Sequence, residues 1–131
     1  MSLEPNRKKI VVVTGASAGV GRATVRAFAR RGADVGLIAR GIDGLEGARR
    51  EVEAEGGRAL VLQADISDAH AVDDAVSRVE RELGPIDVWV NNAMVTVMGP
   101  VAELDADEIR RVTEVTYLGT VNGTLAALAS F

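Results

Sequence analysis

The sequence predicts a three-layer α/β fold with a doubly wound parallel sheet, in a single domain. Short apolar runs alternate with segments of helical periodicity along the chain, which is typical of βαβ units with right-handed crossovers. The apolar runs are continuous, as expected for strands that helices cover on both faces. The chain of 131 residues is long enough to bury a core. We expect residues 9–131 to form this domain and residues 1–8 to be a tail.

Four apolar runs are predicted to be the strands. The first is Ile10–Val13, which consists of β-branched residues only. The second is Val35–Ala39 and the third is Ala59–Gln63. The fourth, Asp87–Val90, follows a Gly-Pro pair that ends the preceding helix. The pattern ends after this strand and one further helix, so we expect a sheet that is truncated after its fourth strand.

Two helices are expected between the first three strands. The first runs from about Val20 to Arg31, and Gly32 provides its C-terminal stop. The second runs from about Asp43 to Glu55, before a pair of glycines. Helical spacing places four apolar residues on one face of the first helix, namely Val20, Ala23, Ala27 and Phe28.

Two more helices follow. The third is expected from Ser67, as the N-cap, to Leu83. Its apolar face is formed by Val72, Val76, Val79 and Leu83. The last is a long helix that ends at about Ala129. It begins near Asp105, where "LDADE" resembles a hydrophobic staple with a capping box between Asp105 and Glu108.

A glycine-rich turn between the first strand and the first helix predicts a phosphate-binding site. Gly15, Gly19 and Gly21 lie in the segment "TGASAGVG". Without side chains the backbone can approach a phosphate closely, and the first amides of the helix point at it with the positive end of the helix dipole. The spacing differs from G-x-G-x-x-G, and no Lys follows as in a Walker A loop. The alternative interpretation is a plain tight turn.

The spacing T-G-x-x-x-G-x-G resembles the signature of short-chain dehydrogenases/reductases, which bind a nicotinamide coenzyme on a Rossmann-type domain. Three other segments resemble the same family. "NNA" at 91–93 resembles its N-N-A-G, "DIS" at 65–67 resembles its Asp-Ile step beside the adenine, and "VTYLGTVNG" at 115–123 resembles its long helix. The resemblance covers roughly residues 9–128. It implies an NAD(P)-dependent oxidoreductase that acts on an alcohol or carbonyl substrate.

The resemblance implies a role for each matching position on the adenosine side of the coenzyme. Five residues would line the pyrophosphate and the adenosine ribose, namely Gly15, Ser17, Gly19, Val20 and Gly21. Asp65 and Ile66 would contact the adenine. Asp65 has an alternative interpretation as a turn or helix-capping residue.

On the nicotinamide side, Asn92 and Ala93 would pass the ribose, and Asn91 would also brace the sheet. Both asparagines have an alternative interpretation as parts of an Asx turn. Met94 stands where the family usually has glycine, and we expect it to be a tolerated variant or a wall of the pocket, without loss of binding. Thr116 is the candidate catalytic position, where many members carry an asparagine that anchors a water of the proton relay. A threonine hydroxyl offers fewer hydrogen-bonding groups.

The end of the second strand favours NADP over NAD. An acidic residue there would bind the 2′-hydroxyl of NAD, and an arginine would accommodate the 2′-phosphate of NADP. The strand ends with Ala39 and Arg40, and a guanidinium is suited to phosphate. Asp34 lies at the wrong end of the strand for this role. Asp43 is near enough to keep NAD as an alternative, and Arg40 has an alternative interpretation as a surface residue.

The family's catalytic Ser and Tyr-x-x-x-Lys group has no counterpart in this sequence. Tyr117, the one tyrosine, is followed four residues later by Val121, and the only lysines are Lys8 and Lys9. A free phenol has a pKa of about 10 and is a poor base without a neighbouring cation. Ser130 lies at the end of a helix, not after a fifth strand. The sequence therefore resembles the amino-terminal half of a family member, either truncated or naturally short.

We expect this half to be inactive on its own. A non-catalytic dinucleotide-binding or regulatory module is one alternative, and a structural fragment that binds no nucleotide is another.

The formal net charge of −4 provides no basic face for nucleic acid. The absence of cysteine suits the cytoplasm, and the apolar run near the start is too short for a membrane span. The single histidine, His70, predicts no metal site. The last helix is expected to join copies of the chain into a homo-oligomer.

Overall fold

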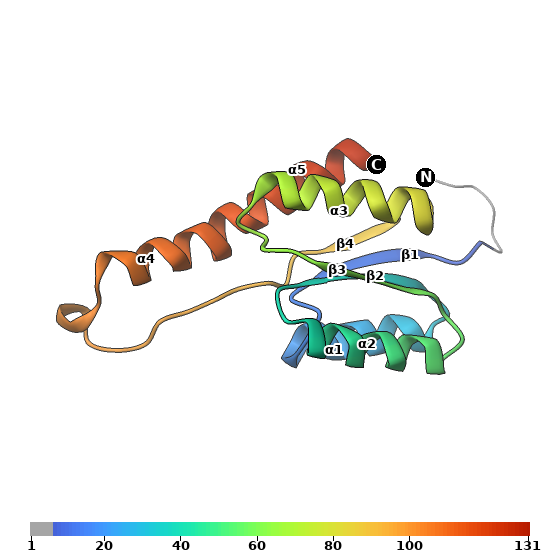
Figure 1. Cartoon of the computed structure of the whole chain (residues 1–131), viewed down its shortest axis with the longest axis horizontal. Coiled ribbons are helices and arrows are strands. Elements are labelled where there is room, and N and C mark those ends of the chain that lie inside the picture. The colour runs from blue at the N-terminus through green and yellow to red at the C-terminus, as the bar shows by residue number, and fades with distance from the viewer. Residues whose placement is uncertain (1–6) are drawn as a thin grey trace.

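The computed structural model describes residues 7–131 and confirms the three-layer α/β fold (Figure 1). Its parallel sheet has the strand order β3-β2-β1-β4. The strands are β1 (Ile10–Thr14), β2 (Asp34–Ala39), β3 (Ala59–Gln63) and β4 (Val88–Val90). The chain winds outward from β1 in both directions, which is the doubly wound arrangement. Residues 1–6 of the expected tail lie outside the described residues.

The central strand β1 is buried on both faces, which explains its continuous apolar sequence. Val11 and Val13 pack with side chains of the helices α1 (Gly19–Arg30) and α2 (Ile42–Ala54). Ile10 and Val12 belong to the core on the other face. Figure 1 shows α1 and α2 below the sheet and α3 and α5 above it. The alternation of side chains along a strand thus divides the core into two parts.

The buried face of α1 differs from the expected one. Val20 is 75% exposed, and Ala23 and Ala27 are also exposed, whereas Phe28 is half-buried. The face that packs on the sheet consists of Gly21, Val25 and Ala29. The helix turns Gly21 inward because only glycine allows its backbone to lie against the preceding turn. This steric demand rotates the apolar stripe away from the one predicted from apolar periodicity.

The helix α3 (Ala69–Glu82) has the predicted apolar face, with Val72, Val76 and Val79 buried. The prediction of Ser67 as its N-cap was wrong. Asp68 is the N-cap, and its carboxylate accepts a hydrogen bond from the Ala71 amide at 3.2 Å. Ser67 is instead part of the preceding turn.

The long last helix is continuous but has three segments. It begins with α4 (Ala106–Val112), passes through a π-helical segment η2 (Thr113–Leu118) and continues as α5 (Gly119–Ser130). The expected capping box is present, with the Glu108 amide 2.8 Å from the Asp105 carboxylate. The π-helical segment was not predicted. Within residues 7–131, no helix combines the length and apolar character needed to cross a membrane.

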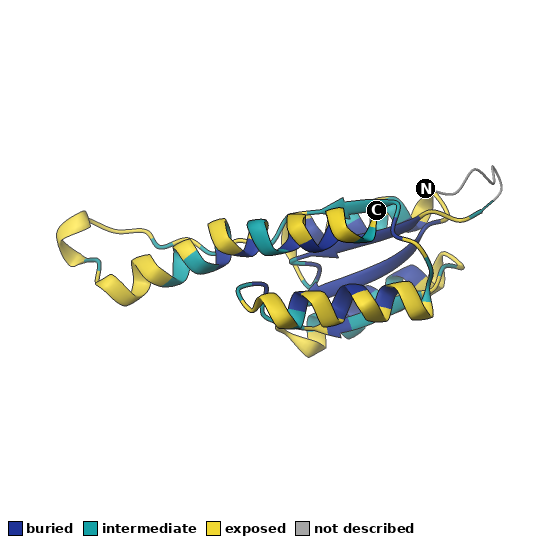
Figure 2. Ribbon diagram, turned by 90° about the horizontal axis from the view of Figure 1, so that it is seen from above, coloured by how far each residue is buried: buried dark blue, intermediate teal, exposed yellow. Residues whose placement is uncertain are grey.

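The start of this helix projects as an arm beyond the carboxyl ends of the strands (Figure 2). The arm comprises residues 96–112, including the short 3₁₀ helix η1 (Val101–Glu103) and α4, and none of the residues in η1 or α4 is buried. Large apolar side chains on it, such as Met98 (90% exposed) and Ile109 (51% exposed), face solvent.

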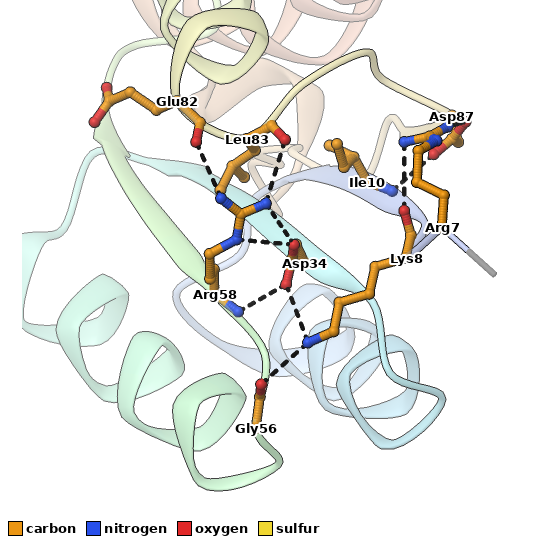
Figure 3. A network of polar contacts seen from close by, with 9 residues as sticks. All are labelled: Arg7, Lys8, Ile10, Asp34, Gly56, Arg58, Glu82, Leu83 and Asp87. Atoms are coloured by element: carbon orange, nitrogen blue, oxygen red, sulfur yellow. Dashed lines mark hydrogen bonds and ion pairs between the residues drawn. The ribbon is translucent and has the colours of Figure 1, made fainter. Parts of the chain in front are cut away.

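A polar network closes the opposite, amino-terminal end of the sheet (Figure 3). The buried carboxylate of Asp34 accepts hydrogen bonds from the backbone amide of Arg58 at 2.8 Å and from its guanidinium at 2.9 Å. The same guanidinium donates to the carbonyl oxygens of Glu82 and Leu83. Asp34 and Arg58 together therefore join the starts of β2 and β3 to the end of α3. Asp34 lies at the opposite end of the sheet from the carboxyl ends of the strands, which removes it from any coenzyme role.

Candidate functional site

A cleft of about 250 Å³ lies at the carboxyl ends of the strands, around the glycine-rich turn. Open parallel sheets bind their ligands in this position, where the strand order reverses. Seven of the eleven predicted binding residues line the cleft, namely Gly15, Ser17, Arg40, Asp65, Ile66, Ala93 and Met94. Four loops that are far apart in the sequence therefore meet at one site.

The other four predicted binding residues, Gly19, Val20, Gly21 and Asn92, do not line the cleft. The side chain of Val20 points to solvent. Gly21 and Asn92 instead form the support beneath the turn. A Cβ atom at Gly21 would collide with the Gly15 carbonyl group, and the Asn92 amide donates to the carbonyl oxygens of Thr14 and Gly15 at 3.1 and 3.3 Å.

Thr14 was part of the sequence signature, but its structural role was not predicted. Its hydroxyl oxygen accepts hydrogen bonds from the backbone amides of Asn92 and Ala93, both at 3.0 Å. These bonds hold the loop after β4 against the glycine-rich turn. Asn91 braces β4 against α5, because its side chain accepts from the Trp89 indole at 2.9 Å and donates to the Thr124 hydroxyl at 3.0 Å.

Asp65 is held by contacts on both carboxylate oxygens. One oxygen accepts from the Ser67 amide at 3.0 Å and the Ser67 hydroxyl at 2.7 Å, which is the turn conformation considered as an alternative. The other oxygen lies 3.0 Å from the guanidinium of Arg111. Partial burial raises the pKa of Asp65, but the hydrogen bonds from Ser67 and Arg111 outweigh it and lower the pKa overall. The side chain is therefore a carboxylate at neutral pH.

Arg40 lies at the rim of the cleft, directly after β2. No residue among 7–131 forms an ion pair with its guanidinium. Asp43, the acid that kept NAD as an alternative, is exposed in the first turn of α2 and does not line the cleft. The rim therefore carries a cation that is available to an anionic ligand.

Thr116 lies in the π-helical segment and does not line the cleft. Its hydroxyl donates to the Val95 carbonyl oxygen at 2.8 Å and accepts from the Val95 amide at 3.2 Å. The single hydroxyl thus makes one bond in each direction and holds the loop after β4 against the helix. Its proton is already donated to this loop. Tyr117, the next residue, is 64% exposed.

Three lining residues from this region were missed in the sequence, namely Val95, Arg111 and Val115. Nothing in the sequence marked Arg111 as a lining residue, because it follows another arginine, Arg110, on a helix face that was expected to be solvent-exposed. Val115 was recognised only as part of the long helix. Among the described residues, no group of three His, Cys, Asp or Glu side chains is placed to bind a metal ion.

The chain matches the family model of the short chain dehydrogenases over residues 9–131. It is 46% identical over 99 residues to a short chain dehydrogenase of Pseudocercospora fijiensis. The matched region covers 76% of this chain and 32% of that protein. It is 41% identical over 92 residues to the gluconate 5-dehydrogenase of Gluconobacter oxydans. This matched region covers 70% of this chain and 36% of that protein.

Solved structures of full-size relatives agree with the sequence comparison. The alcohol dehydrogenase of the archaeon Thermococcus sibiricus, complexed with 5-hydroxy-NADP, superposes with a TM-score of 0.90 at 34% identity over 95% of this chain and 53% of that one. NAD⁺-bound xylitol dehydrogenase superposes with a TM-score of 0.91 at 28% identity, over 97% of this chain and 49% of that one.

The chain spans about a third of the length of the two curated relatives and about half of the two solved structures. Within that span the fold superposes on both solved structures, and the strand order and the position of the cleft are those of a dinucleotide-binding parallel sheet. The chain therefore belongs to the short-chain dehydrogenase/reductase family.

Proposed function

We propose that the cleft binds NADP(H) and that these 131 residues are the coenzyme-binding portion of an oxidoreductase that acts on an alcohol or carbonyl compound. The guanidinium of Arg40 at the rim of the cleft, which pairs with no carboxylate of residues 7–131, carries this proposal. A permanently charged, planar donor at the end of the second strand suits a 2′-phosphate. Relatives with both kinds of coenzyme are known, since one solved structure holds an NADP derivative and another holds NAD⁺.

The glycine-rich turn fits the pyrophosphate of such a coenzyme. A Cβ atom at Gly19 would meet no heavy atom within 4 Å, so the bare backbone at the start of α1 opens on free space. The first amides of a twelve-residue helix have no partner within the helix and favour an anion at this point. Ser17 and Gly15 would complete this part of the site, and Asp65 and Ile66 would hold the adenine.

The loop after β4 would hold the nicotinamide end. Ala93 would contact the ribose, and Met94, which is 64% exposed, would cover the pocket. Asn92 would support this part of the site from beneath, through its hydrogen bonds to the Thr14 and Gly15 carbonyl oxygens. The nicotinamide would donate a hydride to a carbonyl compound or accept one from an alcohol. Thr116 would position this loop through Val95 and would not relay a proton, because its hydroxyl proton is already donated to the Val95 carbonyl oxygen.

Proton transfer to or from the substrate would need groups that these residues do not provide. Tyr117 has Val121 four positions later, where the family has lysine. We infer that the chain alone binds coenzyme without ordinary turnover. The second candidate function is a non-catalytic dinucleotide-binding module, in which Thr116 holds the loop after β4 and does not relay a proton. A homo-oligomer through the last helix is also proposed, since Ile109, Tyr117 and Leu125 are exposed along it.

Calorimetric titration of the chain with NADPH and with NADH tests the proposal. We expect tighter binding of NADPH. Replacing Arg40 with methionine should weaken NADPH binding about tenfold, the effect of one charged hydrogen bond, and leave NADH binding nearly unchanged. Arg50→Met, which removes an exposed charge from α2, is the matched control.

Two results would contradict the proposal. Equal affinity for both coenzymes in the original chain and in Arg40→Met would remove the preference for NADP(H). Failure to bind either coenzyme would favour a structural fragment. Steady oxidation of NADPH by the chain with a panel of carbonyl compounds, at rates ordinary for an enzyme, would overturn only the inference that turnover is absent.

A further inference from the structure

We propose that Arg111 is a positioning residue for the adenosine half of the coenzyme, and that it acts through Asp65 as both orienting partner and counter-ion. This inference rests on the proposed function, because it assumes that the cleft takes a dinucleotide. Arg111 lies on α4, whereas Asp65 lies in the loop between β3 and α3, so their contact joins two separate walls of the cleft.

The contact geometry is a closed triangle of three side chains. The Arg111 guanidinium lies 3.0 Å from one Asp65 carboxylate oxygen and donates to the Ser67 hydroxyl at 3.2 Å. Ser67 in turn donates to the other oxygen of Asp65 at 2.7 Å. Each corner is thus held by the other two, and the plane of the carboxylate has one preferred orientation. The Asp65 side chain is still about one-third exposed toward solvent, so a ligand can reach it.

Electrostatics give Arg111 a second role. A dinucleotide with a 2′-phosphate is a polyanion, and among the described residues Asp65 is the one carboxylate that lines the cleft. An unpaired carboxylate there would repel the phosphates. Arg111 neutralises it locally, and this leaves the guanidinium of Arg40 as the net charge of the lining. Burial raises the pKa of Asp65, but the hydrogen bonds from Ser67 and Arg111 lower it overall, so the side chain stays a carboxylate at the cleft.

Arg111 also connects the arm to the rest of the molecule through polar contacts with Asp65 and Ser67. No residue of α4 is buried, and within residues 7–131 the neighbouring Arg110 is paired only with Asp107 of its own helix, at 3.7 Å. The Arg111 side chain is 34% exposed, compared with 68% for Arg110. The two adjacent arginines therefore form a natural pair for an experiment, because one contacts the cleft and the other does not.

The experiment compares Arg111→Met with the matched control Arg110→Met in the full chain. The probes are NADPH, adenosine 2′,5′-bisphosphate and reduced nicotinamide mononucleotide, and binding is followed by calorimetry and by NMR. We expect Arg111→Met to raise the Kd for NADPH and for the adenosine fragment about tenfold, as for the loss of one charged contact. The Kd for the nicotinamide fragment should stay unchanged, and Arg110→Met should bind all three like the original chain.

A double-mutant cycle tests whether Arg111 acts through Asp65. In an Asp65→Asn background, Arg111→Met should change the Kd for NADPH less than about twofold, because coupled residues are not additive. Arg111→Lys keeps the charge but loses the two-point contact, so its Kd should lie between the others. If circular dichroism shows that Arg111→Met does not fold, Arg111→Lys takes its place in the comparison of binding constants.

Three outcomes would overturn the inference. They are unchanged NADPH binding in a folded Arg111 variant, equal weakening of both fragments, and a full effect of Arg111→Met in the Asp65→Asn background. In each of these cases the original chain still binds NADPH, and the proposed function stands. If the original chain binds neither coenzyme nor the adenosine fragment, the proposed function fails and the inference fails with it.

Discussion

At the scale of single residues, the three glycines of the first turn serve different purposes. Gly15 and Gly19 have φ angles of +67° and +57°, in the region that side chains disfavour. Gly21 has an ordinary helical conformation, but a Cβ atom there would collide with the Gly15 carbonyl group. The first two therefore shape the path of the backbone, and the third allows α1 to approach the turn.

This difference predicts unequal costs for two alanine substitutions. Gly21→Ala should lower the free energy of unfolding by roughly 3 kcal/mol, as for an overpacked site, and abolish NADPH binding. Gly19→Ala places its Cβ atom in open space and should cost only about 1 kcal/mol, for the left-handed conformation. Urea unfolding of both variants measures the difference. Equal losses would show that the close approach at Gly21 has no special role.

The sequence predicted the glycine-rich turn and Asp65 as parts of the candidate binding site because their motifs are local. It did not predict the partner of Asp65. Arg111 is 46 positions away in the chain, and nothing in "IRRV" distinguishes it from Arg110. The contact depends on where a helix lies relative to a distant loop, and this is decided by packing across the whole upper layer.

At the scale of secondary-structure elements, the π-helical segment η2 determines how the last helix meets the cleft. A π turn inserts one extra residue and is frequent at functional sites. Here it contains Thr116, whose hydroxyl bonds to both the amide and the carbonyl group of Val95. The element is therefore attached to the loop that is proposed to hold the nicotinamide end.

Thr116→Val tests this attachment with little change in shape. The substitution leaves both backbone groups of Val95 without their side-chain partner, so the free energy of unfolding should fall by about 1–3 kcal/mol, and NADPH should bind more weakly. Thr120→Val is the control, since that exposed hydroxyl bonds only to a carbonyl group of its own helix. Hydrogen exchange of the Val95 amide should accelerate in the first variant alone. Similar behaviour of the two variants would contradict the proposed attachment.

The elements themselves were predicted well, and the errors lie where a local pattern competes with a close contact. The four strands and the capping box agree with the sequence because apolar runs and cap residues act within a few positions. The apolar face of α1 was wrong because Gly21 had to point inward. The π turn has no signal in apolar periodicity, so the last helix was expected to be regular.

At the scale of the whole molecule, two carboxylates, Glu51 and Asp87, join elements that are far apart in the sequence. Glu51 of α2 binds Arg22 and Arg26 of α1, and the hydrogen bond from Arg22 is the main cause of its lowered pKa. Asp87, before β4, accepts from the Ile10 amide at 2.8 Å. Burial raises the pKa of Asp87, but this bond and Arg7 lower it overall.

These directions predict the acid sensitivity of the fold. A carboxylate whose pKa is lower in the folded state contributes stability above its unfolded pKa of about 4, and this contribution is lost as the pH falls through the folded value. The free energy of unfolding, measured with urea from neutral to acidic pH, should therefore decline below about pH 4. Asp87→Asn should make the free energy of unfolding fall less steeply with acid, whereas Asp107→Asn, at an exposed carboxylate, should leave the pH profile unchanged. Identical profiles for the two variants would contradict the argument.

The molecule also separates its two polar ends. The network around Asp34 and Arg58 closes the amino-terminal edge of the sheet (Figure 3), and none of its residues lines the cleft at the other edge. Anyone who redesigns this scaffold can therefore work on the two ends separately. The coenzyme preference proposed for Arg40 can be altered without touching the contacts that secure the strands. Conversely, thermostability can be improved near Arg58 with the recognition surface left intact.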